Sequence, residues 1–152
     1  MSSLTFWVAG SPAPQGSKIR TRYGMRESST RVRPWREAVK AAAMDAMDRD
    51  DEFTPIEHSG VTVQVQFLFR RPQTHYRTGK QWKDLRPRFL HAPMTRKPDI
   101  DKVCRSTFDA LTDAGVWADD AQVTVLTATK VWGDRITEGA WITINTKEAI
   151  DE

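Results

Sequence analysis

The chain has 152 residues, of which 39% are hydrophobic and 28% charged, and it carries a net charge of +3. This length and composition are typical of one globular domain, residues 1–152, and no apolar run approaches the roughly 20 residues that cross a bilayer. The single cysteine excludes a disulfide within the chain, and the first residues lack a secretory signal pattern. We therefore expect a cytoplasmic protein that does not bind membranes.

The positive charge is concentrated in two segments. Residues 11–40 contain eight Lys or Arg and two acidic residues, and residues 70–105 contain eleven Lys or Arg and three acidic residues. The rest of the chain is net acidic. Two basic segments indicate a polyanionic partner, with nucleic acid the first candidate. Solvated surface and ordinary loops are the alternative.

The first half of the chain predicts a strand, a helix and a second strand. A short aromatic-rich strand is expected at 4–9, where Gly and Pro residues end it. Residues 17–33 are basic and polar, which predicts a loop. Apolar residues at helical spacing predict a helix over 34–47. Strict alternation then predicts a strand over 61–69 with one buried face.

The second half predicts a helix followed by two strands. Residues 70–96 lack periodicity, which indicates a functional or mobile loop that could contain a hairpin. A helix is expected over 99–113, with Asp99 as its N-cap. Further strands are expected at 122–132 and 140–146. This order predicts the α+β class, with two main helices packed on a small mixed or antiparallel sheet.

Four carboxylates flank the second predicted helix, namely Asp99, Asp101, Asp119 and Asp120. Mg²⁺ prefers oxygen ligands and commonly takes one or two carboxylates together with waters and phosphates. If the helix packs back on its sheet, these acids can gather at one point. A metal held there lowers the pKa of a bound water and stabilises charge on a phosphodiester. The sequence therefore predicts a Mg²⁺ site, with Mn²⁺ as a substitute, in a nuclease.

Each of these acids also has an ordinary structural alternative. Asp99 can be only an N-cap, and Asp101 can simply complement the helix dipole. Asp119 and Asp120 can belong to a turn. Arg105 shares a helix face with Asp101 and either contacts the scissile phosphate or joins a surface ion pair.

The two basic segments supply candidate contacts to DNA phosphates. These are Lys18, Arg20, Arg22, Arg70, Arg71, Lys97 and Lys102. Contacts of this kind give affinity without sequence readout. Tyr76, Trp82 and Phe89 are interleaved with basic residues, where they either stack on unpaired bases or close a small core under the loop.

The stretch of residues 97–123, KPDIDKVCRSTFDALTDAGVWADDAQV, resembles the core motif of the RusA family of Holliday-junction resolvases. That motif runs as DxDN, a basic residue four positions after the second Asp, DAL, a Gly, and DDxQ before a strand. Residues 8–18 and the basic run that follows them resemble the family's opening strand and basic loop more loosely.

The resemblance implies a homodimeric endonuclease that binds four-way DNA junctions. It would use Mg²⁺ or Mn²⁺, and no small-molecule cofactor, to nick two opposed strands symmetrically. By position, Asp99, Asp101 and Asp120 would be the catalytic, metal-binding acids, with Asp119 as a further candidate ligand and Arg105 as a catalytic cation. Such enzymes are common in phages and prophages, so the expected location is the cytoplasm of a bacterial or phage-infected cell.

The chain departs from the motif at two positions. Lys102 stands where the motif has Asn, and Arg105 stands where the family has Lys. Arginine keeps the charge but does not give up its proton, so we expect an electrostatic role for Arg105. Two alternatives stay open: a non-catalytic module that binds branched DNA, and a metal nuclease that acts on flaps or single strands.

Overall fold

A computed structural model describes residues 3–16, 18–22, 24–27 and 30–147. Its centre is a four-stranded sheet in the order β1-β6-β4-β5. The strands are β1 (Ser3–Ala9), β4 (Gly60–Phe69), β5 (Val123–Trp132) and β6 (Gly139–Lys147), and the helices are α1 (Val32–Arg49) and α2 (Ile100–Ala114). β5 runs parallel to β4, and the other pairs are antiparallel.

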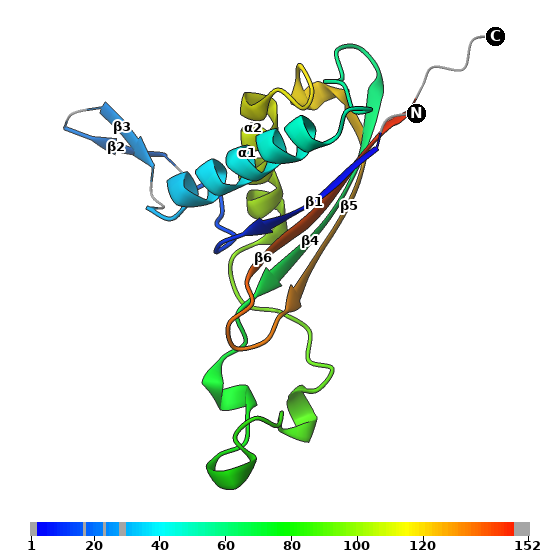
Figure 1. Cartoon of the computed structure of the whole chain (residues 1–152). Coiled ribbons are helices and arrows are strands. Elements are labelled where there is room, and N and C mark those ends of the chain that lie inside the picture. The colour runs from blue at the N-terminus through cyan, green and yellow to red at the C-terminus, as the bar shows by residue number, and fades with distance from the viewer. Residues whose placement is uncertain (1–2, 17, 23, 28–29, 148–152) are drawn as a thin grey trace.

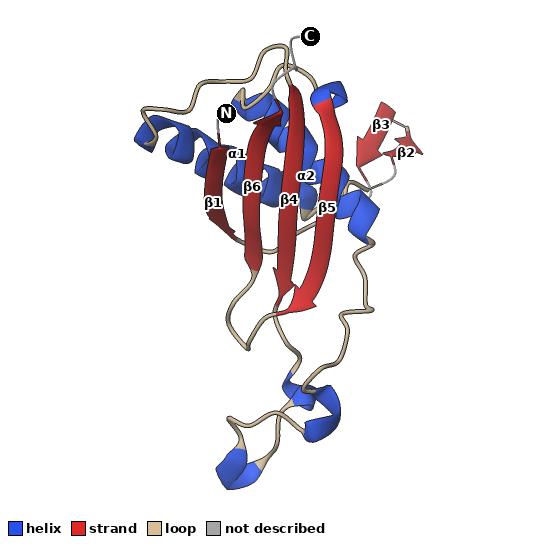
Figure 2. Ribbon diagram, turned by 90° about the vertical axis from the view of Figure 1, so that its right-hand side faces the viewer, coloured by secondary structure: helices blue, strands red, loops and turns tan. Residues whose placement is uncertain are grey.

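Both helices cover the same face of this sheet (Figures 1 and 2). The predicted α+β class, the mixed sheet and the two main helices are thereby confirmed. The observed bounds differ from the predicted ones by one or two residues at most ends. No helix among the described residues is long and apolar enough to span a membrane.

The alternating sequence of β4 builds the core. Its helix-facing residues are all buried, namely Val61, Val63, Val65, Phe67 and Phe69. The two helices are joined by a buried hydrogen bond, in which Trp35 Nε1 donates to Thr107 Oγ1 at 3.1 Å. The Thr107 hydroxyl in turn donates to the Val103 carbonyl at 2.7 Å, so it has both a donor and an acceptor inside the core. This contact fixes α2 against α1 and hence over the sheet.

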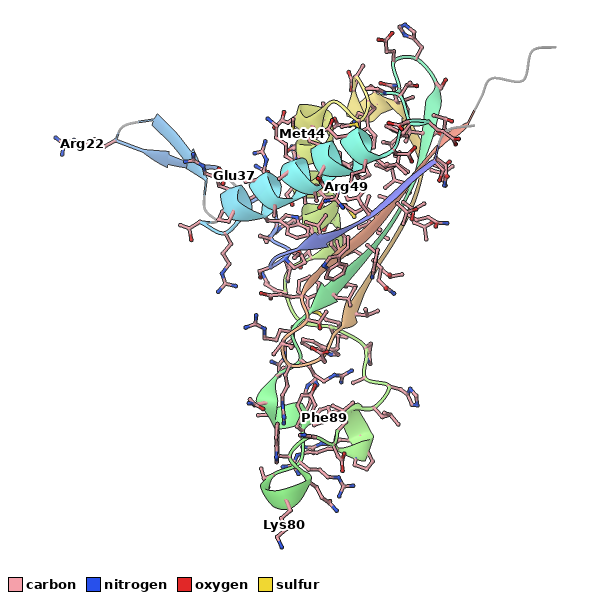
Figure 3. All side chains as sticks on the ribbon, in the orientation of Figure 1. Arg22, Glu37, Met44, Arg49, Lys80 and Phe89 are labelled. Carbon is pink, nitrogen blue, oxygen red and sulfur yellow. The ribbon has the colours of Figure 1, made fainter. Side chains whose placement is uncertain are left out.

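The prediction of a loop over residues 17–33 is wrong for part of that range. The structure has an antiparallel ribbon there, formed by β2 (Lys18–Thr21) and β3 (Gly24–Glu27). A four-residue strand has only two positions on each face, too few for alternation to be recognised in a sequence. The ribbon projects from the helical side of the molecule, and Arg22 lies at its far end (Figure 3).

Residues 70–96 form a projecting lobe between β4 and α2. It extends beyond the end of the sheet, as the green segment at the bottom of Figure 1. The lobe contains three short 3₁₀ turns, η1 (Gln73–His75), η2 (Gly79–Gln81) and η3 (Pro87–Phe89). The hairpin left open for this segment is present only as one antiparallel bridge between Tyr76 and Leu85.

Replacing Phe67 with Ala tests the assignment of the core. Phe67 is fully buried, so we expect Phe67→Ala to lower the free energy of unfolding by about 3–5 kcal/mol, measured in urea. Gln66→Ala is the matched control, because Gln66 is exposed on the uncovered face of the same strand. A comparable loss for both variants would contradict the assignment of the two faces.

Candidate active site

A groove lies between α2 and the outer strand β5. Its volume is about 480 Å³, and it is lined by Ile100, Asp101, Cys104, Arg105, Phe108, Asp120, Leu126 and Ala128. One face of α2 supplies the first five residues, at successive helical turns. β5 supplies Leu126 and Ala128, which register beside buried residues of β4 and therefore face the helices. The groove thus combines exposed charged residues with an apolar floor.

Asp101 and Asp120 lie toward opposite ends of this groove. Asp101 belongs to the first turn of α2. Asp120 precedes β5, and its Oδ1 accepts a hydrogen bond of 2.7 Å from Thr112 Oγ1. Thr112 follows Asp101 by eleven residues, which is about three helical turns, or about 16 Å along the axis. Arg105 lies on α2 between the two carboxylates.

The expected meeting of four carboxylates at one point is not found within the described part of the chain. Across residues 3–16, 18–22, 24–27 and 30–147, no three His, Cys, Asp or Glu side chains are grouped so that they could hold one ion. The length of α2 is the physical reason, since it separates the first acid pair from the second. The carboxylate oxygens of Asp101 and Asp120 still match a hard divalent cation in donor type, because Mg²⁺ often takes only one or two of them.

Asp99 occupies the N-cap position of α2 without capping it through its side chain. Its backbone is extended, as an N-cap requires, but its carboxylate accepts no capping hydrogen bond. Asp99 Oδ2 instead lies 3.6 Å from Lys102 Nζ. Lys102, at the position where the motif has Asn, is therefore an ion-pair partner for the first acid of the motif.

Asp119 belongs to a turn, which was the structural alternative to metal binding for this residue. Its Oδ1 accepts from the Ala121 backbone N–H at 2.9 Å, which caps the short turn η4 (Asp120–Gln122). Gln122 completes this capping box, because its Oε1 accepts from the Asp119 N–H at 2.9 Å. Gln122 Nε2 also donates to the carbonyls of Ile56 and Ser59, each at 3.1 Å. The last residue of DDxQ thus anchors the turn that holds Asp120 in the groove.

Lys130 is a residue of this site that no sequence motif indicates. It extends from the helix-facing side of β5, and its Nζ donates to the carbonyls of Arg96 at 2.7 Å and Pro98 at 2.8 Å. These carbonyls lie three residues and one residue before Asp99. A lone lysine in a strand gives no sequence signal for such contacts, because both acceptors are backbone atoms more than thirty residues away.

Two other ionisable groups on α2 are affected by burial. Burial, and to a smaller extent the nearby charge of Asp101, raises the pKa of the Cys104 thiol to about 11. Burial also raises the pKa of the Asp109 carboxyl, and Asp120 adds to this shift while Arg36 opposes it. Cys104 is consequently a protonated residue of the groove floor at neutral pH.

The residues predicted to contact DNA differ in whether their side chains are already bonded within the protein. Arg71 is largely engaged within the protein, since its Nη1 donates to the Phe89 carbonyl at 2.9 Å and its Nε to the Gly133 carbonyl at 3.2 Å. Arg70 forms an ion pair of 3.1 Å with Glu138. Lys97 and Arg22 are exposed. The side chains of Lys18 and Arg20 lie outside the described residues.

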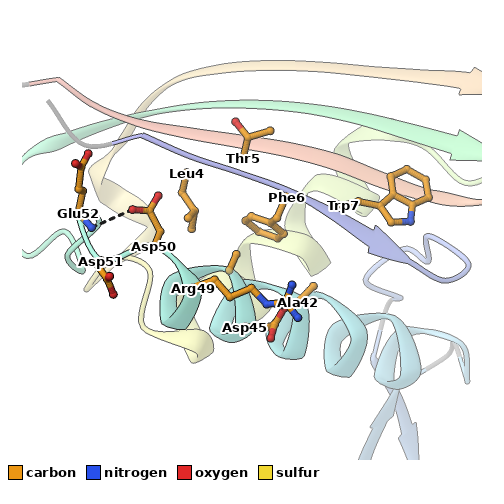
Figure 4. Close-up of a pocket in the computed structure, with 11 residues that line it drawn as sticks. Leu4, Thr5, Phe6, Trp7, Ala42, Asp45, Arg49, Asp50, Asp51 and Glu52 are labelled. Carbon is orange, nitrogen blue, oxygen red and sulfur yellow. Dashed lines mark hydrogen bonds and ion pairs between the residues drawn. The ribbon is translucent and has the colours of Figure 1, made fainter.

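A larger hollow of about 660 Å³ lies between β1 and α1 (Figure 4). Its rim includes the acidic run of residues 50–52, and Arg49 is paired with Asp45 at 3.1 Å. Asp50 Oδ1 accepts from the Glu52 backbone N–H at 3.0 Å, so this carboxylate holds the loop itself. An acidic rim repels phosphate, and for this reason we place the functional site in the groove beside α2.

The family model described as endodeoxyribonuclease RusA matches residues 9–145, which include both the groove and the lobe. The chain belongs to the RusA family. It is also similar to proteins named crossover junction endodeoxyribonuclease RusA from Enterobacteria phage 82, Escherichia coli K12 and Shigella sonnei. Each is 54% identical over 33 residues, a stretch that covers 22% of this chain and 28% of the relative. The resemblance expected from residues 97–123 is thereby confirmed at the level of the family.

Replacing Lys130 tests its role in holding the segment before α2. Lys130→Met removes the donor from two carbonyls, so we expect the free energy of unfolding to fall by about 1–3 kcal/mol. Hydrogen exchange should also quicken at the Val103 amide, whose N–H donates to the Asp99 carbonyl at 3.2 Å in the first turn of α2. Thr129→Ala, on the opposite face of β5, is the control and should change neither quantity. Unchanged exchange in Lys130→Met would show that these hydrogen bonds do not hold the segment.

The buried thiol predicts a dependence of stability on pH. The pKa of Cys104 is raised from an ordinary 9.0 to about 11, so the unfolded chain loses this proton at lower pH than the folded chain. The contribution of the thiol to stability is then complete below pH 9 and is lost as pH rises through 11. Thiolate absorbance during a pH titration should give a midpoint near 11 in the native protein. A native midpoint near 9 would contradict burial of the thiol.

Proposed function

We propose that this protein is a metal-dependent endodeoxyribonuclease that cuts four-way DNA junctions by paired symmetric nicks. The observation that carries the proposal is the groove beside α2, which contains Asp101, Arg105 and Asp120. These are the acids and the cation that the family motif implies. The basic surface of a chain that belongs to the RusA family supports DNA as the substrate.

The groove residues divide the chemistry between them. Asp101 and Asp120 offer carboxylate oxygens to Mg²⁺ or Mn²⁺, with Asp99 near the same end as Asp101. A divalent ion, when bound, supplies an acidified water and stabilises charge on the phosphate. The guanidinium of Arg105 presents a planar fork of N–H donors, which suits phosphate oxygens. We therefore assign Arg105 to phosphate binding and not to proton transfer.

A homodimer is part of this proposal. β5 is an edge strand of ten residues whose outer side pairs with no other described strand. Val125 and Leu126 on it are 44% and 43% exposed. Long edges of this kind are normally covered, because they present unpaired backbone groups to other chains. A junction has approximate two-fold symmetry and two strands to cut, which suits a two-fold dimer.

The direction of α2 gives the dimer a further role. α2 runs antiparallel to β5, since Lys130 reaches Pro98 at the start of the helix and Asp120 reaches Thr112 near its end. If two copies pair their β5 edges antiparallel, Asp101 of each copy approaches Asp120 of the other. Two sites would then form, each with acids from both copies. This arrangement would unite the carboxylates that one chain keeps apart.

Cleavage of a labelled synthetic four-way junction tests the proposed activity. We expect paired symmetric nicks in Mg²⁺ or Mn²⁺, none in EDTA, and little cutting of matched duplex or single strands. Asp101→Asn should lower the cleavage rate at least about 100-fold, because it removes a charged metal ligand, while junction binding persists. Gln66→Ala is the control variant and should cut normally, because Gln66 is exposed on β4, outside the groove and away from the β5 edge.

Each other outcome of this assay points to a different function. Tight junction binding without cutting in either metal would favour a non-catalytic module that binds branched DNA. Preferential cutting of flaps or single strands would favour a different metal nuclease. Full activity in Asp101→Asn would remove Asp101 from the mechanism.

A further inference from the structure

The projecting lobe carries a strong positive charge, and none of its residues lines the groove. Residues 70–96 contain eight Lys or Arg and one acidic residue. Figure 3 shows the lobe extending away from the sheet, with Lys80 at its far end and Phe89 closer to the body. The lobe has three 3₁₀ turns but no α-helix and no named strand. Its internal contacts therefore determine whether it presents a fixed surface to a ligand.

Arginine and aromatic side chains hold the lobe together from within. The His75 ring stacks on Phe89, with ring centres 4.0 Å apart and planes 8° apart, and meets Trp132 edge-on at 5.2 Å. Arg86 Nε donates to the Tyr76 carbonyl at 3.0 Å. Tyr76 and His75 are buried as a result. The lobe is therefore an organised unit, in which Tyr76 is buried and Phe89 is half-buried against His75.

Trp82 differs from these aromatic residues because half of it remains exposed. Its exposed fraction is 51%. Arg135, from the turn between β5 and β6, places its guanidinium 4.8 Å from the Trp82 ring and 3.9 Å from the Tyr76 ring. It also donates to the Trp82 carbonyl. Lys83 Nζ lies 5.3 Å from the same ring. The indole is thus held in place by cations while part of its surface stays open.

An exposed aromatic ring among cations is the arrangement that binds unpaired nucleotides. Bases stack on the ring while the cations contact neighbouring phosphates, and the affinity depends little on sequence. Exposed cations of the lobe are suited to this role, namely Arg77, Lys80, Lys83 and Arg88. Duplex DNA keeps its bases stacked and offers no free base face, whereas a branch point can expose one.

The root of the lobe adjoins the candidate active site. Lys130 binds the carbonyls of Arg96 and Pro98, where the lobe returns to α2. The Arg96 guanidinium lies 5.9 Å from the ring of Trp132, which is on the same face of β5 as Lys130, so a second residue of β5 contacts this root. A strand that enters the groove at its Asp101 end consequently has the lobe next to it.

We propose that the lobe is a second DNA-contact surface, on which Trp82 stacks against an unstacked base at the branch point of the substrate. The nearby lysines and arginines hold the adjoining phosphates. This inference rests on the proposed function, and it assigns to the lobe a part in choosing branched DNA over duplex. The groove cuts, and the lobe recognises the branch.

Two substitutions at Trp82 separate stacking from apolar volume. Trp82→Leu keeps an apolar side chain without an aromatic face, and Trp82→Phe keeps an aromatic face. We expect Trp82→Leu to weaken binding of a four-way junction by roughly tenfold to a hundredfold, and Trp82→Phe to retain most of the affinity. Duplex affinity should be the same in both. Trp141→Leu is the matched control, since Trp141 is 49% exposed on the uncovered sheet face.

Binding is measured in EDTA by fluorescence anisotropy, with the full-length chain and a junction that carries 2-aminopurine at the branch point. Wild-type protein should change the 2-aminopurine emission, and Trp82→Leu should not. Unchanged junction affinity in Trp82→Leu, or an equal loss for junction and duplex, would overturn the inference. If the wild type itself fails to prefer the junction, the proposed function fails. If it prefers the junction and Trp82→Leu does too, only the role of the lobe fails.

Discussion

The parallel pairing of β5 with β4 determines where every candidate site residue lies. It places the start of β5 beside the end of α2, where Asp120 accepts from Thr112. It also places the end of β5 beside the start of α2, where Lys130 reaches Pro98. Because α2 has 15 residues, and so a length of about 22 Å, the groove holds its two acidic ends apart. The chemistry proposed for this chain depends on how that separation is overcome.

The lobe, which we propose as a DNA-binding surface, is attached at one end of the sheet. The lobe leaves the sheet at the end of β4 and returns just before Asp99, and its interior is held by arginines that donate to backbone carbonyls. Arg71 and Arg86 thus stabilise the lobe, which leaves the outer cations and Trp82 to contact a ligand. The proposed cutting and the proposed recognition thereby belong to neighbouring parts of the chain.

Much of the fold was predictable from local patterns. Alternation in β4 and helical spacing in α1 identified elements whose buried faces the structure confirms. The motif identified Asp101, Arg105 and Asp120 as candidate catalytic residues, and all three line the groove. It could not show whether the fold brings the acids at the two ends of the helix together. Lys130 was missed because its acceptors are distant backbone carbonyls, and the cap made by Asp119 depends on a turn with no sequence periodicity.

Mixing two inactive variants tests most directly whether two copies share each site. Asp101→Asn and Asp120→Asn, each inactive alone, are given different tags, and the heterodimer is isolated through both tags. If sites combine Asp101 of one copy with Asp120 of the other, the heterodimer keeps one site with both acids and one with neither. We expect this heterodimer to nick one strand of each junction. A stable heterodimer as inactive as its parents, beside an active wild type, would show that the two copies do not share their sites in this way.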